Sequence, residues 1–150
     1  PRTSKEIANI FHLDNSSATK GVKNAVSIIN ELEIDMNNND KTLYTNTTPL
    51  VFIERYCTKL NINEELTKLS KFIAQIIDKN NLIPENTPPS IAAAIVYFVS
   101  QTFKLNISKQ DVNNVSQISE VTINKCYKKL ETYKTKLIPN QLLNKYNINV

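Results

Sequence analysis

The segment from Pro88 to Pro139 contains the clearest structural signals of the chain and reads PPSIAAAIVYFVSQTFKLNISKQDVNNVSQISEVTINKCYKKLETYKTKLIP. Its first part, Pro89 to about Phe103, is apolar on nearly every side, which is typical of a helix in the centre of a domain. A capping box predicts a second helix from Ser108 to about Val115. After a short turn at Ser116 to Ile118, a third helix is expected at about Ser119 to Tyr133. This order predicts a buried helix followed by a helix-turn-helix.

The third of these helices has two faces of opposite character. Its apolar face recurs at helical spacing and consists of Ile123, Cys126, Tyr127 and Leu130. The complementary face, which we call the outer stripe, consists of Val121, Asn124, Lys125 and Lys128. Nearby positive charge is added by Lys129, Lys134 and Lys136. Asn and Lys side chains can read base edges or bind phosphates, and a Val side chain can contact a thymine methyl group. The pattern suits a helix that enters a DNA groove, but composition alone favours the alternative, a solvated surface helix that is rich in lysine.

The rest of the chain is also predicted to be helical, because it contains one glycine and lacks the alternating pattern of strands. Helices are expected at Ser4 to Phe11, where Thr3 and Glu6 suit a capping box, and at about Ala18 to Glu33. Two more precede the central helix, with apolar positions at Ile53, Tyr56, Cys57 and Leu60 in the first and at Leu66, Leu69, Ile73, Ile76 and Ile77 in the second. The predicted fold class is therefore all-α, with five helices in the main domain.

A polar segment divides the chain into two parts. Residues 35–49 include the runs MNNND and TNTT and read as a linker. We therefore assign residues 1–34 to one unit, residues 50–139 to the five-helix domain and residues 140–150 to a C-terminal tail.

Composition argues against several classes of function. The formal charge of +4 and the pI of about 9.0 are mildly basic, which suits an anionic partner without requiring one. Cys57 and Cys126 lack metal-ligand neighbours at short spacing, so we expect buried reduced thiols and no zinc site. The longest apolar run, Ile91 to Val99, is shorter than the roughly 17–25 residues that span a bilayer, so no membrane partner is expected.

The sequence has no glycine-rich phosphate loop, HExxH motif or nucleophile elbow, and His12 has no acid partner at a recognisable spacing. We therefore expect neither an enzyme nor a cofactor.

Several segments, in this order, resemble the core of transcription factor IIB and of its archaeal counterpart TFB. That core has two cyclin-like repeats of five helices each. The likeness to its second repeat runs without gaps from Phe52 to Pro139, in the segments FIERYCTKL, NLIPENTPPSIAAAIVYFVSQ, SEVTINKCYKKL and, for the archaeal proteins in particular, YKTKLIP. Upstream, PRTSKEIANIF and SSATKGVKNAVSIINELE resemble the fourth and fifth helices of the first repeat. The resemblance implies a cyclin-like repeat that contains the helix-turn-helix, preceded by the last two helices of another such repeat.

The same resemblance implies that the chain begins inside the first repeat, after the zinc ribbon of the family and three helices of that repeat. The apolar faces of the first two helices would then lack their usual partners. These faces consist of Ile7, Ile10 and Phe11 in one helix and of Val22, Val26 and Ile29 in the other. We expect them to pack on the second repeat or on a neighbouring copy, which would make the chain self-associate.

Members of this family bind the TATA-binding protein on bent promoter DNA, and the eukaryotic members recruit RNA polymerase II in the nucleus. The resemblance therefore implies a general transcription initiation factor whose helix at 119–133 enters the major groove upstream of the TATA box, at the TFIIB recognition element. Two alternatives remain open: a cyclin-fold interaction module that binds a protein kinase, and a TFIIB-related factor of another polymerase. Kinase-binding cyclins use other helices and have no reason to present the outer stripe.

Individual contact positions of the family can be located on this sequence. The family's base-reading valine matches Val121, and its next basic residue on that face matches Lys128. Its base-reading arginine falls at Asn124, which is a departure, because Arg reads guanine whereas Asn prefers adenine. Lys23 matches a basic position in the region where the family meets the TATA-binding protein, and Lys20 lies one turn earlier. We therefore predict Lys20 and Lys23 as contacts to that protein.

The loop before the central helix departs from the family as well. The family's Gly-Arg-Ser becomes Glu85, Asn86 and Thr87. Glu85 would repel a phosphate, whereas Thr87 and the helix N-terminus can hold one. We predict DNA contacts at Thr87 and at Ser108 in addition to the outer stripe.

Overall fold

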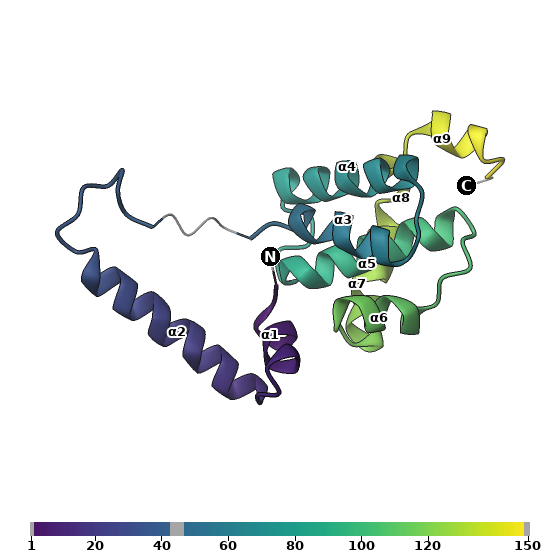
Figure 1. Cartoon of the computed structure of the whole chain (residues 1–150). Helices are drawn as coiled ribbons and strands as arrows, with labels where there is room; N and C mark the ends of the chain where they lie inside the picture. Colours follow the sequence, from purple (N-terminus) through teal and green to yellow (C-terminus); the bar gives the residue numbers. More distant parts are fainter. Residues whose placement is uncertain (1, 43–46, 149–150) are drawn as a thin grey trace. The chain divides into compact units, whose positions relative to one another are not determined.

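The computed structural model describes residues 2–42 and 47–148, and every regular element in them is a helix (Figure 1). The helices are α1 (Ser4–Ile10), α2 (Asn15–Leu32), α3 (Leu50–Lys59), α4 (Glu64–Asn80), α5 (Pro88–Thr102), α6 (Lys109–Ser116), α7 (Glu120–Thr132), α8 (Lys134–Leu137) and α9 (Asn140–Lys145). They form two compact units, residues 1–46 and residues 47–150. The all-helical prediction is confirmed. Residues 43–46 of the predicted linker lie outside the described part of the chain.

The first unit consists of α1 and α2, which pack against each other. Thr3 Oγ1 accepts a hydrogen bond from the Glu6 amide at 3.2 Å, and the Glu6 carboxylate accepts one from the Thr3 amide at 2.8 Å, so the predicted capping box is present. Asp14 Oδ1 accepts from the Ser17 amide at 2.8 Å and caps α2. The predicted start of this helix at Ala18 is therefore wrong, because the Asp14 cap begins it three residues earlier.

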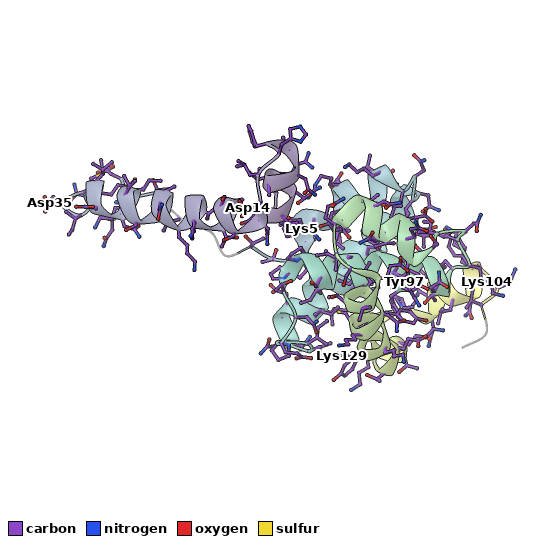
Figure 2. The ribbon with its side chains drawn as sticks, turned by 90° about the horizontal axis from the view of Figure 1, so that it is seen from below. Lys5, Asp14, Asp35, Tyr97, Lys104 and Lys129 are labelled. Atoms are coloured by element: carbon purple, nitrogen blue, oxygen red, sulfur yellow. The ribbon has the colours of Figure 1, made fainter. Side chains whose placement is uncertain are left out.

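Much of the apolar surface of this unit is open to solvent. Among the described residues of α2, Ala18 alone is buried, and Figure 2 shows side chains standing out along this helix between Asp14 and Asp35. Of the apolar faces singled out in the sequence, the exposed members are Ile10, Phe11 and Val22, and the half-buried members are Ile7, Val26 and Ile29. Leu32, at the end of α2, is 76% exposed. The unit by itself therefore leaves apolar side chains uncovered.

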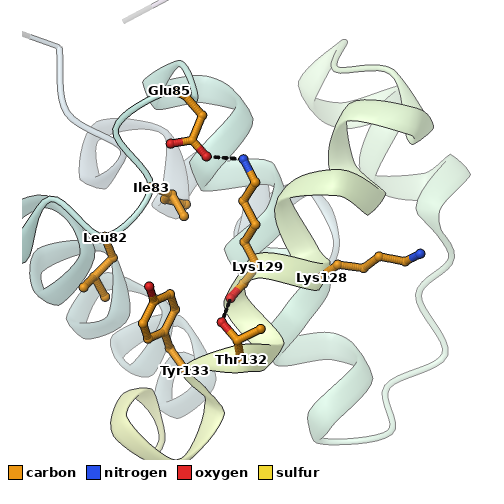
Figure 3. A pocket seen from close by; sticks show the side chains of 7 residues that line it. All are labelled: Leu82, Ile83, Glu85, Lys128, Lys129, Thr132 and Tyr133. Atoms are coloured by element: carbon orange, nitrogen blue, oxygen red, sulfur yellow. Dashed lines mark hydrogen bonds and ion pairs between the residues drawn. The ribbon is translucent and has the colours of Figure 1, made fainter.

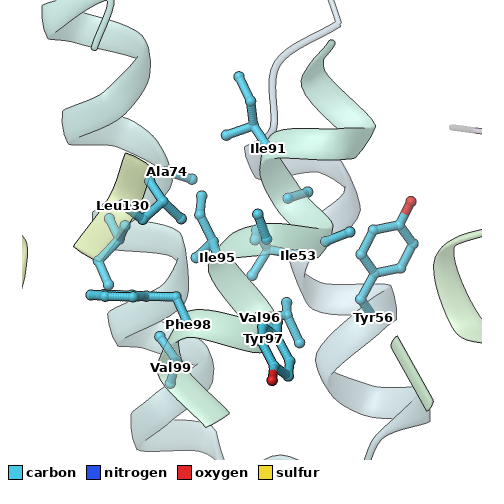
Figure 4. Packing of buried hydrophobic residues seen from close by; sticks show 14 of the residues in the cluster. Ile53, Tyr56, Ala74, Ile91, Ile95, Val96, Tyr97, Phe98, Val99 and Leu130 are labelled. Atoms are coloured by element: carbon cyan, nitrogen blue, oxygen red, sulfur yellow. The ribbon is translucent and has the colours of Figure 1, made fainter. Parts of the chain in front are cut away.

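Helix α5 forms the centre of the second unit (Figure 4). Every residue from Ser90 to Ser100 is buried, and α3, α4, α6 and α7 all pack against it. Tyr56 of α3 and Leu130 of α7 lie on different sides of it. The Ser100 hydroxyl donates to the Val96 carbonyl oxygen at 2.7 Å, which satisfies a polar group inside the core. The predicted central helix is confirmed. It was expected because a helix that is apolar on all sides is stable only when other helices cover it.

Local signals set the starts of the helices in this unit. Helix α5 begins with Pro88 and Pro89, which suit a first turn because its amides have no intrahelical partner. Helix α4 begins after Asn63, whose side chain accepts a hydrogen bond from the Leu66 amide at 2.8 Å. These caps fix the residue at which each helix begins, so that the apolar positions of the sequence fall on the face that packs in the core.

The ends of the described helices use no glycine. Several are followed by other residues in the left-handed conformation, namely His12, Asn61, Asn81, Lys104, Gln117 and Asn147. Gln117, with φ of 62°, ends α6 and forms the turn before α7. For a residue with a Cβ this conformation costs roughly 1–2 kcal/mol, and Asn tolerates it better than most.

Two short helices come after α7 and pack on the same core. Leu137 and Ile138 are buried at the end of α8, and Leu143 of α9 is buried as well. Lys145 Nζ donates to Glu65 Oε1 of α4 at 2.7 Å. The segment 140–150, read from the sequence as a tail, thus contains a helix that contacts the core.

Candidate nucleic-acid interface

Helices α6 and α7 form a helix-turn-helix whose turn is held by side-chain hydrogen bonds. Asn113 Nδ2 donates to the Ile118 carbonyl oxygen at 2.7 Å. The Ile118 amide donates to Ser116 Oγ at 3.2 Å, and this buried hydroxyl donates to the Val112 carbonyl oxygen at 2.7 Å. Ser119 then provides the N-cap of α7. The direction of α7 is therefore set by the residues of the turn itself.

The inner face of α7 anchors the helix to the core. Ile123, Cys126 and Leu130 have no exposed surface. Tyr127 is half-buried, and its ring stands edge-on to that of Tyr97 with centroids 5.1 Å apart. Each fully buried aliphatic side chain contributes roughly 1.5–3 kcal/mol, so α7 is held firmly without help from its outer face.

The outer face of α7 carries the outer stripe of the sequence analysis. Val121 is 65% exposed, Lys125 and Lys128 are exposed, and Asn124 is half-buried. Within the described part of the chain, neither lysine has a carboxylate partner. Figure 3 shows the Lys128 side chain projecting away from the loop that contacts its neighbour Lys129. The stripe thus presents an apolar group, an amide and two unpaired ammonium groups.

Positive charge is concentrated in the C-terminal third of the chain, which includes the helix-turn-helix. Residues 104–150 contain eight lysines and three acidic residues, which gives a formal charge of +5. Residues 47–103 contain five basic and five acidic residues and are neutral, and residues 1–46 contain five basic and six acidic residues. The mild basicity of the whole chain therefore understates the local charge near α7, and that charge favours an anionic partner.

Lys129 behaves differently from the lysines of the outer stripe. Its ammonium group forms an ion pair with Glu85, in the loop between α4 and α5, and donates to Asn86 Oδ1 at 3.1 Å (Figure 3). The hydrogen bond from Lys129 holds the pKa of Glu85 below its ordinary value. The expectation that Lys129 adds positive charge here is therefore wrong, because its charge is balanced. Sequence spacing could not reveal the pair, since its members lie 44 residues apart.

The other predicted contact residues lie at helix starts or in the first unit. Thr87 is exposed at the N-cap of α5, where its hydroxyl lies 2.8 Å from Ser90 Oγ. Ser108 caps α6, and its hydroxyl donates to the Asp111 carboxylate at 2.6 Å, so that hydroxyl is already engaged. Lys20 and Lys23 are exposed on α2. The structure therefore brings together the four residues of the outer stripe, whereas these other residues lie on separate elements.

The described residues offer little for other kinds of chemistry. Cys57 and Cys126 are buried and free, and burial raises the pKa of both thiols, that of Cys126 to about 11. Among the residues that the structure covers, no group of His, Cys, Asp and Glu is placed to hold a metal ion. None of the described helices has the length and apolar character needed to cross a membrane.

Comparison with known proteins gives one consistent result. The family model of the transcription factor TFIIB repeat matches residues 42–133. A putative transcription initiation factor IIB-like protein of Acanthamoeba polyphaga mimivirus is 33% identical over 99% of this chain and 33% of its own length. Transcription initiation factor IIB of Encephalitozoon cuniculi is 36% identical over 65% of this chain and 31% of its own length, and that of Oryza sativa is 29% identical over 93% and 43%. The chain thus spans about a third to two fifths of these relatives. With a helix-turn-helix on a central buried helix and these matches, the chain belongs to the TFIIB family of transcription initiation factors.

Proposed function

We propose that this chain is a core part of a transcription initiation factor that binds the TATA-binding protein and promoter DNA and helps to recruit RNA polymerase II. In a eukaryote it would act in the nucleus. One observation carries the proposal: a firmly anchored helix of a helix-turn-helix presents two lysines, unpaired among the residues that the structure describes, beside an exposed valine and an amide. Lys125 and Lys128 would bind phosphates and position α7, while Val121 and Asn124 would meet base edges in the major groove.

The proposed base preference differs from that implied by the family's arginine. Asn124 would hydrogen-bond with an adenine, and Val121 would contact a thymine methyl group. Lysine ammonium groups grip phosphates as point charges and do not discriminate between sequences. We therefore expect strong salt dependence and a modest preference for A·T pairs at the positions that α7 reaches.

The remaining partners are inferred from the first unit and from the family. Lys20 and Lys23 are exposed on α2, and we propose that they contact the TATA-binding protein. Thr87 and Ser108 would add contacts to the DNA backbone from the starts of α5 and α6. A role with a different RNA polymerase is the second candidate, because family membership alone does not distinguish between polymerases.

The experiment is a gel shift with the TATA-binding protein and an AT-rich TATA promoter, with and without this chain, at several salt concentrations. The expected result is a slower-migrating ternary complex. Lys125→Ala and Lys128→Ala should each weaken it and reduce the slope of log affinity against log salt by about 0.9. Lys79→Ala, which removes an exposed lysine at the end of α4, is the matched control and should change neither.

Two outcomes would count against the proposal. If the ternary complex is insensitive to salt and to both substitutions, α7 does not contact the DNA. Failure to form any complex with the TATA-binding protein would favour the cyclin-fold interaction module instead. Pull-down of the ternary complex with purified RNA polymerase II, compared with another nuclear polymerase, separates the two initiation-factor candidates.

A further inference from the structure

The ion pair between Glu85 and Lys129 links the loop before α5 to the helix that carries the outer stripe. Lys129 makes both of its described contacts to this loop, to the Glu85 carboxylate and to Asn86 Oδ1 (Figure 3). The Lys129 side chain is still 40% exposed and that of Glu85 is 55% exposed. Both charges are therefore accessible to ions in the solvent.

This pair is not what holds α7 in place. Exposed ion pairs contribute little to stability, whereas Ile123, Cys126 and Leu130 fix the same helix by complete burial. Breaking the pair would leave α7 where it is and would leave Lys129 free to move. The pair therefore affects the net charge of this surface and does not determine the position of α7.

Lys129 is also a sequence neighbour of the outer-stripe lysines, although its side chain extends from α7 in a different direction from that of Lys128 (Figure 3). Lys129 directly follows Lys128 and lies one helical turn after Lys125. Glu85, Lys128 and Lys129 line one open groove of about 340 Å³, together with Leu82, Ile83, Thr132 and Tyr133. At 0.1 M salt the Debye length is about 10 Å, so a phosphate at this groove is within range of both Glu85, which repels it, and Lys129, which attracts it.

We propose that Glu85 masks Lys129 and so sets how tightly this chain binds DNA. The inference rests on the proposed function and assigns a specificity-determining role to Glu85, a residue outside the helix-turn-helix. A free Lys129 would add a phosphate contact that is equal for all sequences. By pairing with Lys129, Glu85 prevents that contact and so weakens non-specific binding. The base contacts of α7 then contribute a larger share of the total binding free energy.

The test compares Glu85→Gln, Lys129→Met and the double variant in the ternary gel shift. Glu85→Gln keeps the size of the side chain and removes its charge. It should tighten binding about eightfold at 0.1 M salt and steepen the salt slope by about 0.9, equally for matched and scrambled upstream sequences. Lys129→Met should leave the slope unchanged, because paired Lys129 makes no phosphate contact, and it should weaken binding, because Glu85 then repels the DNA without compensation. In the double variant the steeper slope of Glu85→Gln should disappear, and its gain in affinity should shrink to the relief of that repulsion.

The matched control is Glu54→Gln, which breaks the ion pair between Glu54 of α3 and Lys71 of α4 and adds the same net charge. It should change neither affinity nor slope. Circular dichroism and thermal unfolding show that each variant is folded before binding is measured. If Glu85→Gln tightens binding equally in the Lys129→Met background, Glu85 acts by direct repulsion and the mask is overturned. Weaker binding by a folded Glu85→Gln variant also overturns it. A wild-type chain that forms no ternary complex overturns the proposed function and the mask together, whereas wild-type binding with an unchanged Glu85→Gln slope overturns the mask alone.

Discussion

The ring of Tyr146 stands edge-on to the ring of Phe103, with centroids 5.0 Å apart and planes at 78°. Phe103 ends the central helix α5, and Tyr146 follows α9. The Tyr146 hydroxyl also donates to Glu65 Oε2 at 2.8 Å. One tyrosine thus joins the last described helix to both the central helix and the start of α4.

Because of this contact, Tyr146→Ala should destabilise the second unit. Loss of an aromatic pair and of partly buried ring area should cost about 1–2 kcal/mol in the free energy of unfolding. Tyr146→Phe keeps the ring and loses one hydrogen bond, so it should cost about half as much. Urea unfolding followed by circular dichroism measures both values. If Tyr146→Ala unfolds like the wild type, α9 does not stabilise the domain.

The same contact should depend on pH through Glu65. Hydrogen bonds from Lys145 and Tyr146 hold the pKa of the Glu65 carboxyl below its ordinary value of 4.5. A carboxyl with a lowered pKa in the folded state adds stability above pH 4.5, and this contribution is lost as the pH falls through the folded value.

The difference in melting temperature between wild type and Glu65→Gln should therefore be largest near neutral pH and should shrink in acid. Glu54→Gln, in another exposed ion pair, reports how much of the effect is general. A difference that stays constant down to about pH 3 would show that the Glu65 carboxylate is not stabilised by these contacts.

Both thiols should be protected in the folded chain. Cys57 and Cys126 have no exposed surface, and burial raises the pKa of Cys126 to about 11 from an ordinary value of 9.0. The lower thiolate fraction alone should slow alkylation of Cys126 roughly a hundredfold at about pH 8. Iodoacetamide labelling followed by mass spectrometry should find little reaction in buffer and complete reaction in urea. Rapid labelling of Cys126 in buffer would mean that α7 leaves the core easily.

Asn124→Arg should change which base the outer stripe prefers. An arginine there can form two hydrogen bonds with guanine, so preference for guanine at one upstream position should rise by roughly 1–3 kcal/mol. Selection of bound promoters from a randomised upstream region, with the TATA-binding protein present, measures the change. Asn114→Arg, at an exposed position of α6, is a control that adds the same charge outside the stripe. Equal base preference for wild type and Asn124→Arg would show that this position does not face the bases.

The exposed apolar side chains of the first unit should make the chain associate with a second copy. Phe11 is 65% exposed and Leu32 is 76% exposed, and covering such area yields about 25 cal/mol per Å². Sedimentation velocity should show a larger species as concentration rises. Leu32→Asp should weaken it, whereas Asn30→Asp, which adds the same charge two residues earlier, should not. A wild-type chain that stays monomeric at every concentration would contradict this prediction.

Local patterns predicted the parts of the fold that depend on neighbours in the sequence. The apolar run around Ile95 implied a surrounded helix, and the capping pattern at Ser108 located the start of the helix-turn-helix. The stripe on α7 could be read in the same way, because residues three and four apart share a helix face. The start of α2 was missed although its signal, the Asp14 cap, is also local.

Contacts between distant segments could not be predicted in this way. Glu65 and Lys145 lie 80 residues apart, and Glu85 and Lys129 lie 44 residues apart. Periodicity indicates which face of a helix is apolar, but it does not indicate which charge lies opposite another once the helices pack. The docking of α9 and the balanced charge of Lys129 therefore had to come from the structure.

The left-handed residues at helix ends cost this protein stability that substitutions could recover. Asn61, Asn81 and Asn147 belong to a residue type that tolerates the conformation well, whereas Lys104 and Gln117 belong to types that adopt it less readily. Glycine adopts this conformation without a steric penalty, although it gains more freedom on unfolding. Substitution by glycine at Lys104, which lies outside both the buried core and the turn before α7, is therefore a route to a more heat-resistant relative.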